Sequence, residues 1–456
     1  MALFSFIPRR YLAVVAIALA LVMSVMDGTI VNVALPTLAR EFGTSPSTTI
    51  WIVNAYQLTI TVTLLSFSAL GDIHGYKKIF LFGTGVFCVM SLVCSLTTSF
   101  AGLTAARILQ GIGAAAIMSV TTALLRIIYP PQYIGRGMSI NAMVVAVSIA
   151  AGPSLAGAIL SVASWHWLFA INVPLGICAF VAGYFLLPLN PDSGKVRKFD
   201  KTGSIASALT FGLLIYTLEG IAHNENRTSI LIQIVLLAVI GTLFIRRELR
   251  EETPILPVDL MKIPIFALSI LASVTSFTAQ LLAMVSLPFY LQNVAGRNEV
   301  ETGLLLTPWP VATILTAPVA GRLVEKFHPG VLGAIGMLIY SAGLYLLATL
   351  PAAPANADIA WRLMLCGAGF GLFQTPNNST MIASAPPHRS GGANGMQGTA
   401  RLLGQTMGTT LVALIFRMVA PGQGMQTCMY VALGFALTAA VISSLRVSQP
   451  APMRRK

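Results

Sequence analysis

The sequence has little charge and few of the side chains on which enzymes and metalloproteins depend. Only 9% of its 456 residues are charged and 56% are hydrophobic, a balance foreign to water-soluble domains of this size. Its five histidines are scattered, and its five cysteines lack the spacing of a disulfide or zinc framework. No Gly-x-x-x-x-Gly-Lys-Ser/Thr motif occurs, which argues against an ATP-driven pump. We therefore expect no enzyme, no metal and no cofactor.

Apolar runs of about 20 residues, long enough to cross a bilayer as helices, recur instead along the whole chain. Strands of a membrane barrel would be about half as long and would alternate in polarity. The sequence thus predicts an all-α polytopic membrane protein surrounded by lipid. We place fourteen spans at 11–38, 49–69, 79–98, 101–125, 137–161, 166–187, 203–222, 229–246, 264–291, 300–321, 331–350, 359–383, 392–416 and 427–445.

The basic residues orient these spans. With the first run taken as an uncleaved span, 21 of the 28 Lys and Arg lie on the side of the N-terminus. Lys and Arg concentrate in cytoplasmic loops, so we predict that both termini are cytoplasmic. The net charge of +13 is spread over short loops and does not indicate a nucleic-acid partner.

Asp27 is an ionisable side chain that lies well inside the first apolar run. A carboxylate in the membrane costs on the order of 2.5 to 3.5 kcal/mol on insertion scales, so it calls for a function or a partner. One hypothesis is a proton-titrating group that faces a polar cavity, and the alternative is a group that only fixes helix packing. The helical rise places Arg107, on the oppositely directed fourth span, near the same depth, so the two are predicted to meet.

An internal repeat divides the chain. A small residue, Leu and an acid recur as Ser68 to Asp72 and as Gly321 to Glu325, each at the same end of an equally directed span. The two acids are 253 residues apart, which fits a half of about 190 residues plus an insert of about 65. Such halves with a binding site between them are typical of secondary transporters. We predict a six-helix bundle at 1–190, two inserted transmembrane helices at 191–262 and a second six-helix bundle at 263–456.

Five motifs in order make the sequence similar to the major facilitator superfamily, and to its fourteen-span drug:proton antiporters, the EmrB/QacA-like group. They are Asp27-Gly-Thr-Ile-Val-Asn32-Val-Ala-Leu-Pro36, Gly71-Asp72-x-x-Gly75-x-Lys77-Lys78, Arg107-x-x-Gln110-Gly111-x-Gly113, Gly152-Pro153-x-x-Ala156-Gly157 and the stretch from Trp165 to Gly176. The similarity covers essentially the whole chain. Ile73 and Tyr76 replace basic residues of the family pattern, so the cytoplasmic gate is expected to be held less tightly by charge.

The resemblance implies a major facilitator fold and a proton-coupled multidrug efflux antiporter of the bacterial inner membrane. Such a protein exports lipophilic, often cationic, toxic compounds by alternating access, and we expect it to act as a monomer. The implied roles are proton coupling for Asp27 and Arg107; a cytoplasmic gate for Asp72, Gly75, Lys77, Lys78, Arg126 and Arg136; and an antiporter motif for Gly152, Pro153 and Gly157.

Aromatic, Met and amide side chains within the spans are candidates for substrate contact, because they offer adaptable apolar contacts and cation–π attraction. The alternative for each is a place in the core or the interfacial belt. The candidates are Trp51, Asn54, Tyr56, Gln57, Gln280, Met284, Phe289, Tyr290, Trp309, Phe373, Gln374 and Asn377. The alternative function is a proton-coupled symporter or exporter of one small metabolite.

Overall fold

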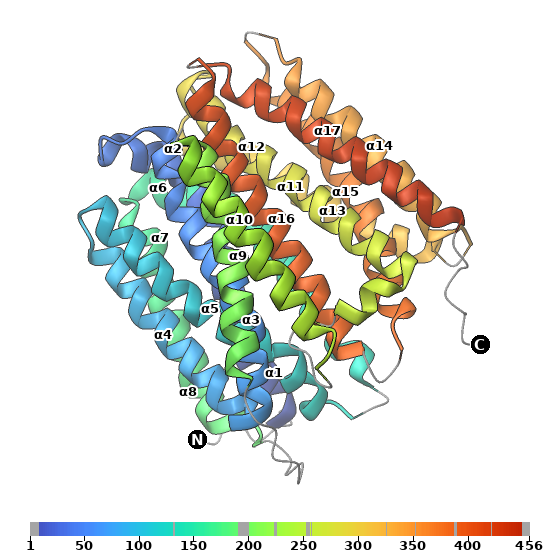
Figure 1. Cartoon of the computed structure of the whole chain (residues 1–456). Coiled ribbons are helices and arrows are strands. Elements are labelled where there is room, and N and C mark those ends of the chain that lie inside the picture. The colour runs from blue at the N-terminus through green and yellow to red at the C-terminus, as the bar shows by residue number, and fades with distance from the viewer. Residues whose placement is uncertain are drawn as a thin grey trace.

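The computed structural model describes residues 9–130, 133–189, 200–222, 226–251, 256, 258–324, 326–351, 353–386, 390–420 and 422–448. Within them all regular structure is helical, which confirms the all-α prediction (Figure 1). The α-helices are α1 (Arg9–Glu41), α2 (Pro46–Thr49), α3 (Trp51–His74), α4 (Tyr76–Leu96), α5 (Phe100–Ile128), α6 (Ile134–Val162), α7 (His166–Ala170), α8 (Asn172–Leu186), α9 (Lys201–Ala222), α10 (Arg227–Glu248), α11 (Pro264–Asn293), α12 (Glu299–Leu306), α13 (Pro308–Leu323), α14 (Pro329–Ala348), α15 (Asn356–Ser384), α16 (Ser390–Met418) and α17 (Gly424–Leu445); short 3-10 helices occupy Val258–Lys262 and Arg446–Ser448.

Local sequence accounts for where several of these helices begin and break. Asn298 and Glu301 form a capping box at the start of α12, each side chain accepting from the other's backbone N–H. Pro308 then interrupts the predicted tenth span, because its ring removes a backbone donor, and α13 begins there. The sixth predicted span is likewise divided into α7 and α8 at Ile171.

Eleven stretches of the described chain are long and apolar enough to cross a membrane. The long helices α9, α15 and α16 are not among them, although each covers a predicted span. They run alongside the apolar helices in Figure 1. The count of fourteen therefore stays a prediction, whereas a polytopic helical membrane protein is what the structure shows.

The helices gather into a first group, α1 to α8, and a second group, α11 to α17, each with extensive contacts among its members. We call the face at which α1 begins the N-terminal face, and the other the opposite face. The two groups meet near the opposite face, where α6 packs on α12 and α1 on α11, and α16 also packs along α3. These groups follow the predicted halves, whose boundaries remain predictions.

Helices α9 and α10, which cover the predicted insert, pack along one side of the molecule (Figure 1). Helix α9 contacts both α3 and α16, so it covers the seam between the two groups, and α10 lies against α9. The outer surface of α10 is apolar and exposed, at Leu231, Val235 and Leu243 among others, as expected of a lipid-facing helix. Arg247 near the end of α10 donates to both carboxylate oxygens of Asp200 before α9, at 2.6 and 2.7 Å.

Candidate functional site

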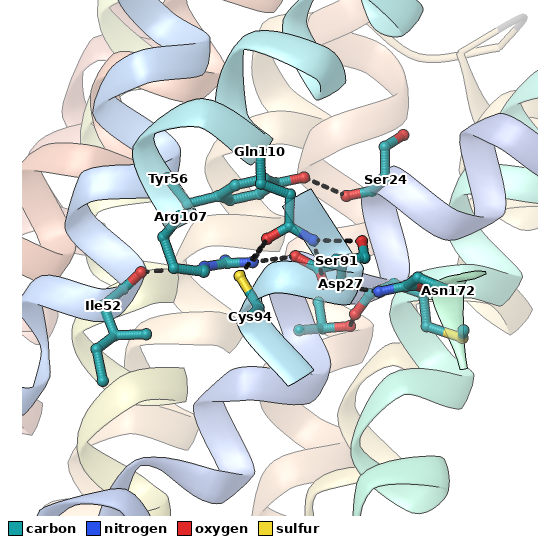
Figure 2. A network of polar contacts seen from close by, with 11 residues as sticks. Ser24, Asp27, Ile52, Tyr56, Ser91, Cys94, Arg107, Gln110 and Asn172 are labelled. Atoms are coloured by element: carbon teal, nitrogen blue, oxygen red, sulfur yellow. Dashed lines mark hydrogen bonds and ion pairs between the residues drawn. The ribbon is translucent and has the colours of Figure 1, made fainter. Parts of the chain in front are cut away.

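The central feature of the first group is a buried ion pair between Asp27 of α1 and Arg107 of α5. Arg107 Nη1 donates to Asp27 Oδ2, and the side chains are 0% and 1% exposed, respectively. Two amides complete the shell of the other carboxylate oxygen: Gln110 Nε2 at 3.2 Å and Asn172 Nδ2 of α8 at 2.9 Å (Figure 2). The predicted meeting of Asp27 and Arg107 is thus confirmed.

The guanidinium of Arg107 is held from several sides. Its Nε donates to the Ile52 carbonyl of α3 at 3.2 Å. The guanidinium carbon, Cζ, lies 4.0 Å from the ring centre of Tyr56 and 5.6 Å from that of Phe169. Tyr56 is fixed in turn by a 2.8 Å hydrogen bond to the Ser24 carbonyl of α1. The cation therefore gains cation–π attraction in addition to its carboxylate. Its Nη2 is buried without a hydrogen-bond partner.

Gln110 extends the network to α4. Its Oε1 accepts from Arg107 Nη1 at 2.6 Å, and its Nε2 also reaches Ser91 Oγ at 2.9 Å. Gln110 and Asn172 were not among the predicted site residues. The signal for Gln110 was its place three residues after Arg107 on the same helix face. For Asn172 only the family motif offered one.

The carboxylate of Asp27 does not face a polar cavity in this conformation, which corrects that expectation. Helices α1, α3, α4, α5 and α8 surround the network and leave the Asp27 side chain 1% exposed. Sequence predicted the depth of the residue, but the rotation of α1 decides where its side chain points. A buried charge needs such a partner and hydrogen bonds, because desolvation otherwise outweighs the Coulomb gain.

The antiporter motif on α6 forms the contact between the two groups at the opposite face. A Cβ on Gly157 would lie 2.9 Å from the Glu299 carbonyl of α12, and one on Gly303 would overlap the Pro153 carbonyl. Within the first group, a Cβ on Gly152 would overlap the side-chain oxygen of Thr29 on α1. Small residues therefore permit the close approach, as they do at membrane helix interfaces.

Polar bonds complete this closed end, which we call the outer seal. Arg40 of α1 pairs with Glu299 of α12 at 3.1 Å, and Thr37 donates to the same oxygen at 3.2 Å. Gln292 of α11 donates to the Val33 carbonyl at 2.9 Å. The outer seal thus joins α1 to two helices of the second group.

The predicted gate residues lie at the N-terminal face. Asp72, at the end of α3, is exposed and accepts a 2.7 Å hydrogen bond from Tyr76. Gly75 has a φ of +102°, which favours glycine at this sharp α3–α4 turn. Arg126 is also exposed. The ion pairs between described side chains do not include one between Arg126 and Asp72. The side chain of Arg136 lies outside the described residues.

Lys77 and Lys78 follow in the first turn of α4. Lys78 is exposed, and the Lys77 Nζ lies 5.8 Å from the ring centre of Tyr184 on α8. The structure therefore places Lys77 beside α8.

Several predicted substrate residues have the contacts of a core instead. Trp309 packs edge-on against Tyr340 at 5.4 Å, and Phe373 continues this aromatic cluster through Phe370. Phe289 packs against Phe416 at 5.2 Å. Tyr56 belongs to the Asp27–Arg107 network. These four side chains are buried in this conformation, and their contact with substrate stays a prediction.

Asn377 is engaged by a second buried cation, Arg446. The Arg446 Nη1 donates to Asn377 Oδ1 at 2.6 Å and to Ser269 Oγ at 3.2 Å, and Arg446 is 1% exposed. Arg446 begins the short 3-10 helix after α17 and lies buried at one end of the second group. Asn377 therefore holds α15 to the end of α17.

The remaining candidates are placed less tightly. Asn54 of α3 has its Nδ2 3.5 Å from Thr410 Oγ1 of α16. Asn54 therefore points from α3 toward α16 of the second group. Gln57, also on α3, has a buried Oε1 without a hydrogen-bond partner. The half-buried candidates are Trp51, Gln280, Met284, Tyr290 and Gln374.

Comparison with known proteins gives this geometry a context. The family model described as Major Facilitator Superfamily matches residues 17–409. The Uncharacterized transporter YebQ of Escherichia coli (strain K12) is 54% identical over 444 residues, which cover 97% of each chain. A solved bacterial homologue of the human lysosomal transporter Spinster, inward-facing and unoccupied, matches with a TM-score of 0.68 at 15% identity, over 96% of this chain and 97% of that one. At that identity the likeness shows the fold.

Two further relatives differ in what their names say they carry. Riboflavin transporter RibZ of Clostridioides difficile (strain 630) is 29% identical over 413 residues, covering 90% of this chain and 88% of that protein. Multidrug resistance protein Stp of Mycobacterium tuberculosis (strain ATCC 25618 / H37Rv) is 29% identical over 409 residues, covering 89% and 76%.

Proposed function

The chain belongs to the major facilitator superfamily, and on that basis we propose that it is a proton-coupled antiporter exporting lipophilic, often cationic, small molecules. Members of this family are transporters of small molecules rather than enzymes. The observation that carries the proposal is the buried Asp27–Arg107 pair with its two amide donors. It supports a group whose charge state governs how α1 packs on α5.

Protonation of Asp27 is the step we assign to the coupling. The ionised carboxylate accepts from one guanidinium and two amides, all of them donors to a negative charge. A neutral carboxyl leaves Arg107 buried without a counter-ion, a state costly enough to favour rearrangement of the network. Substrate release and proton uptake are then coupled, because both depend on the charge state of Asp27.

The outer seal supports alternating access. In this conformation α6 and α12 are in close contact beside the Arg40–Glu299 pair, so a route to the opposite face requires these contacts to separate. We take that face as the outside of a bacterial inner membrane and the N-terminal face as the cytoplasm, from the distribution of Lys and Arg. One proton crossing 100 mV contributes about 2.3 kcal/mol, a concentration ratio of roughly fifty.

The test uses proteoliposomes that contain purified protein and a trapped pH dye. We expect addition of a lipophilic cation such as tetraphenylphosphonium to evoke proton movement with the wild type and none with Asp27→Asn. Asp358→Asn, which alters a half-buried acid of α15 paired with Arg362, serves as the matched control and is expected to behave as the wild type. Proton movement that persists in Asp27→Asn contradicts the proposed coupling.

A second candidate is a proton-coupled transporter of one specific metabolite, which the name of RibZ supports at the same 29% identity. The same vesicles separate the two functions. A response to several unrelated cations supports the exporter, whereas a response to riboflavin and to no cation supports the second candidate.

A further inference from the structure

An apolar groove lies on the surface of the first group, between α4 and α8. It has a volume of about 470 Å³, and all the residues that line it are apolar, among them Leu81, Phe82 and Val89 of α4 and Phe180 of α8. Phe82, Val89 and Phe180 are 49%, 55% and 38% exposed, so the groove opens away from the helix bundle. In a bilayer such a surface faces lipid chains.

Gly85 lies in the wall of the groove opposite Phe180. A Cβ at this position would lie 3.5 Å from the Phe180 ring, so the missing side chain leaves the space above that ring open. Leu81, Gly85 and Val89 are spaced four residues apart and therefore follow one ridge of α4. The groove extends along the helix for on the order of 12 Å, as the helical rise requires.

Two lysines terminate the groove at the N-terminal face. Lys77 lies one turn before Leu81, and Lys78 lies one turn before Phe82, so each lysine continues a ridge that lines the groove. Tyr184 lies one turn after Phe180 on α8, at the same end of the groove. Its ring centre is 5.8 Å from Lys77 Nζ. The ammonium groups therefore lie at the level where a lipid headgroup would meet the apolar surface.

The charge at this end favours an anion. The first turn of α4 adds the positive end of the helix dipole, and Gly75 supplies no capping side chain there. The neighbouring acid, Asp72, lies on α3 and accepts a hydrogen bond from Tyr76. His74 is the other titratable side chain of the turn.

We propose that the α4–α8 groove binds one anionic phospholipid, with an acyl chain along Leu81, Gly85 and Val89 and the phosphate at Lys77 and Lys78. Neither the antiport function nor its substrate is needed for this site. It rests on two independent features, an apolar groove lined by α4 and α8 and a cationic end in register with it. Basic residues near a membrane surface each add to attraction for anionic lipid, which sets the expected selectivity.

The test is native mass spectrometry of the full chain with phosphatidylglycerol and phosphatidylcholine of identical acyl chains. We expect the wild type to hold one phosphatidylglycerol on the order of 10-fold more tightly than phosphatidylcholine. Lys77→Gln with Lys78→Gln should abolish the preference, whereas Lys77→Arg with Lys78→Arg should keep it. Inorganic phosphate alone should not compete, because it cannot use the groove.

Gly85→Leu tests the apolar part, since it fills the groove and leaves both lysines in place. We expect it to weaken the binding of both lipids. The matched change is Gly434→Leu at an exposed position of α17, where a Cβ meets nothing within 4 Å, and it should alter the binding of neither lipid. Elution of each variant as the wild type in size exclusion controls for folding. Equal binding of both lipids by the wild type, a preference that survives the double glutamine variant, or unchanged binding by Gly85→Leu each overturns the proposal.

Discussion

Removing one partner of the Asp27–Arg107 pair should cost far more stability than removing both. Asp27→Asn leaves a guanidinium that is 0% exposed without its counter-ion, and Arg107→Gln leaves the carboxylate in the same position. Loss of one partner of a buried pair costs about 3 to 5 kcal/mol, whereas replacement of both is often close to neutral. We therefore expect the double variant to be more stable than either single variant.

The assay is equilibrium unfolding of each variant in mixed micelles by titration with SDS, followed by tryptophan fluorescence. The double-mutant cycle should yield a coupling energy of about 3 kcal/mol or more, well above the ~0.5 kcal/mol within which independent sites add. Asp358→Asn breaks the half-buried pair that Asp358 forms with Arg362 one turn along α15; it is the reference and should cost less, about 1 kcal/mol. Single effects that simply add would refute the view that the pair is formed in the folded protein.

Three further predictions concern other contacts. Arg40→Glu should loosen the outer seal and speed labelling of nearby engineered cysteines by an impermeant maleimide, and Glu299→Arg added to it should restore slow labelling. Gly303→Leu should abolish transport, because the new side chain overlaps a backbone carbonyl of α6. The amount of protein in the membrane should stay normal, and normal transport would contradict this packing. Burial alone would raise the pKa of Asp200, but hydrogen bonds from Arg247 and Gly203 lower it below its usual 3.8. The stability this pair provides should be complete above about pH 4 and lost as pH falls further through the folded pKa, so the difference between wild type and Asp200→Asn should shrink there.

Sequence alone determined the features that follow from one helix at a time. Apolar run length predicts a polytopic helical protein, and the helical rise along oppositely directed spans was enough to bring Asp27 and Arg107 to one depth. The same periodicity could have added Gln110, three residues from Arg107. Glycines at 152 and 157 indicated close packing without naming the partners, which are α1 for Gly152 and α12 for Gly157.

The tertiary structure decided which way each side chain points, because the rotation of a helix depends on all of its neighbours together. Asp27 therefore lies inside the first group and not on a cavity, and Trp309 and Phe373 join an aromatic core. Asn377 meets Arg446 across 69 residues of sequence, a contact that no local pattern contains. The depth of a residue in the membrane follows from its position along one helix, whereas the direction of its side chain depends on how all the helices pack.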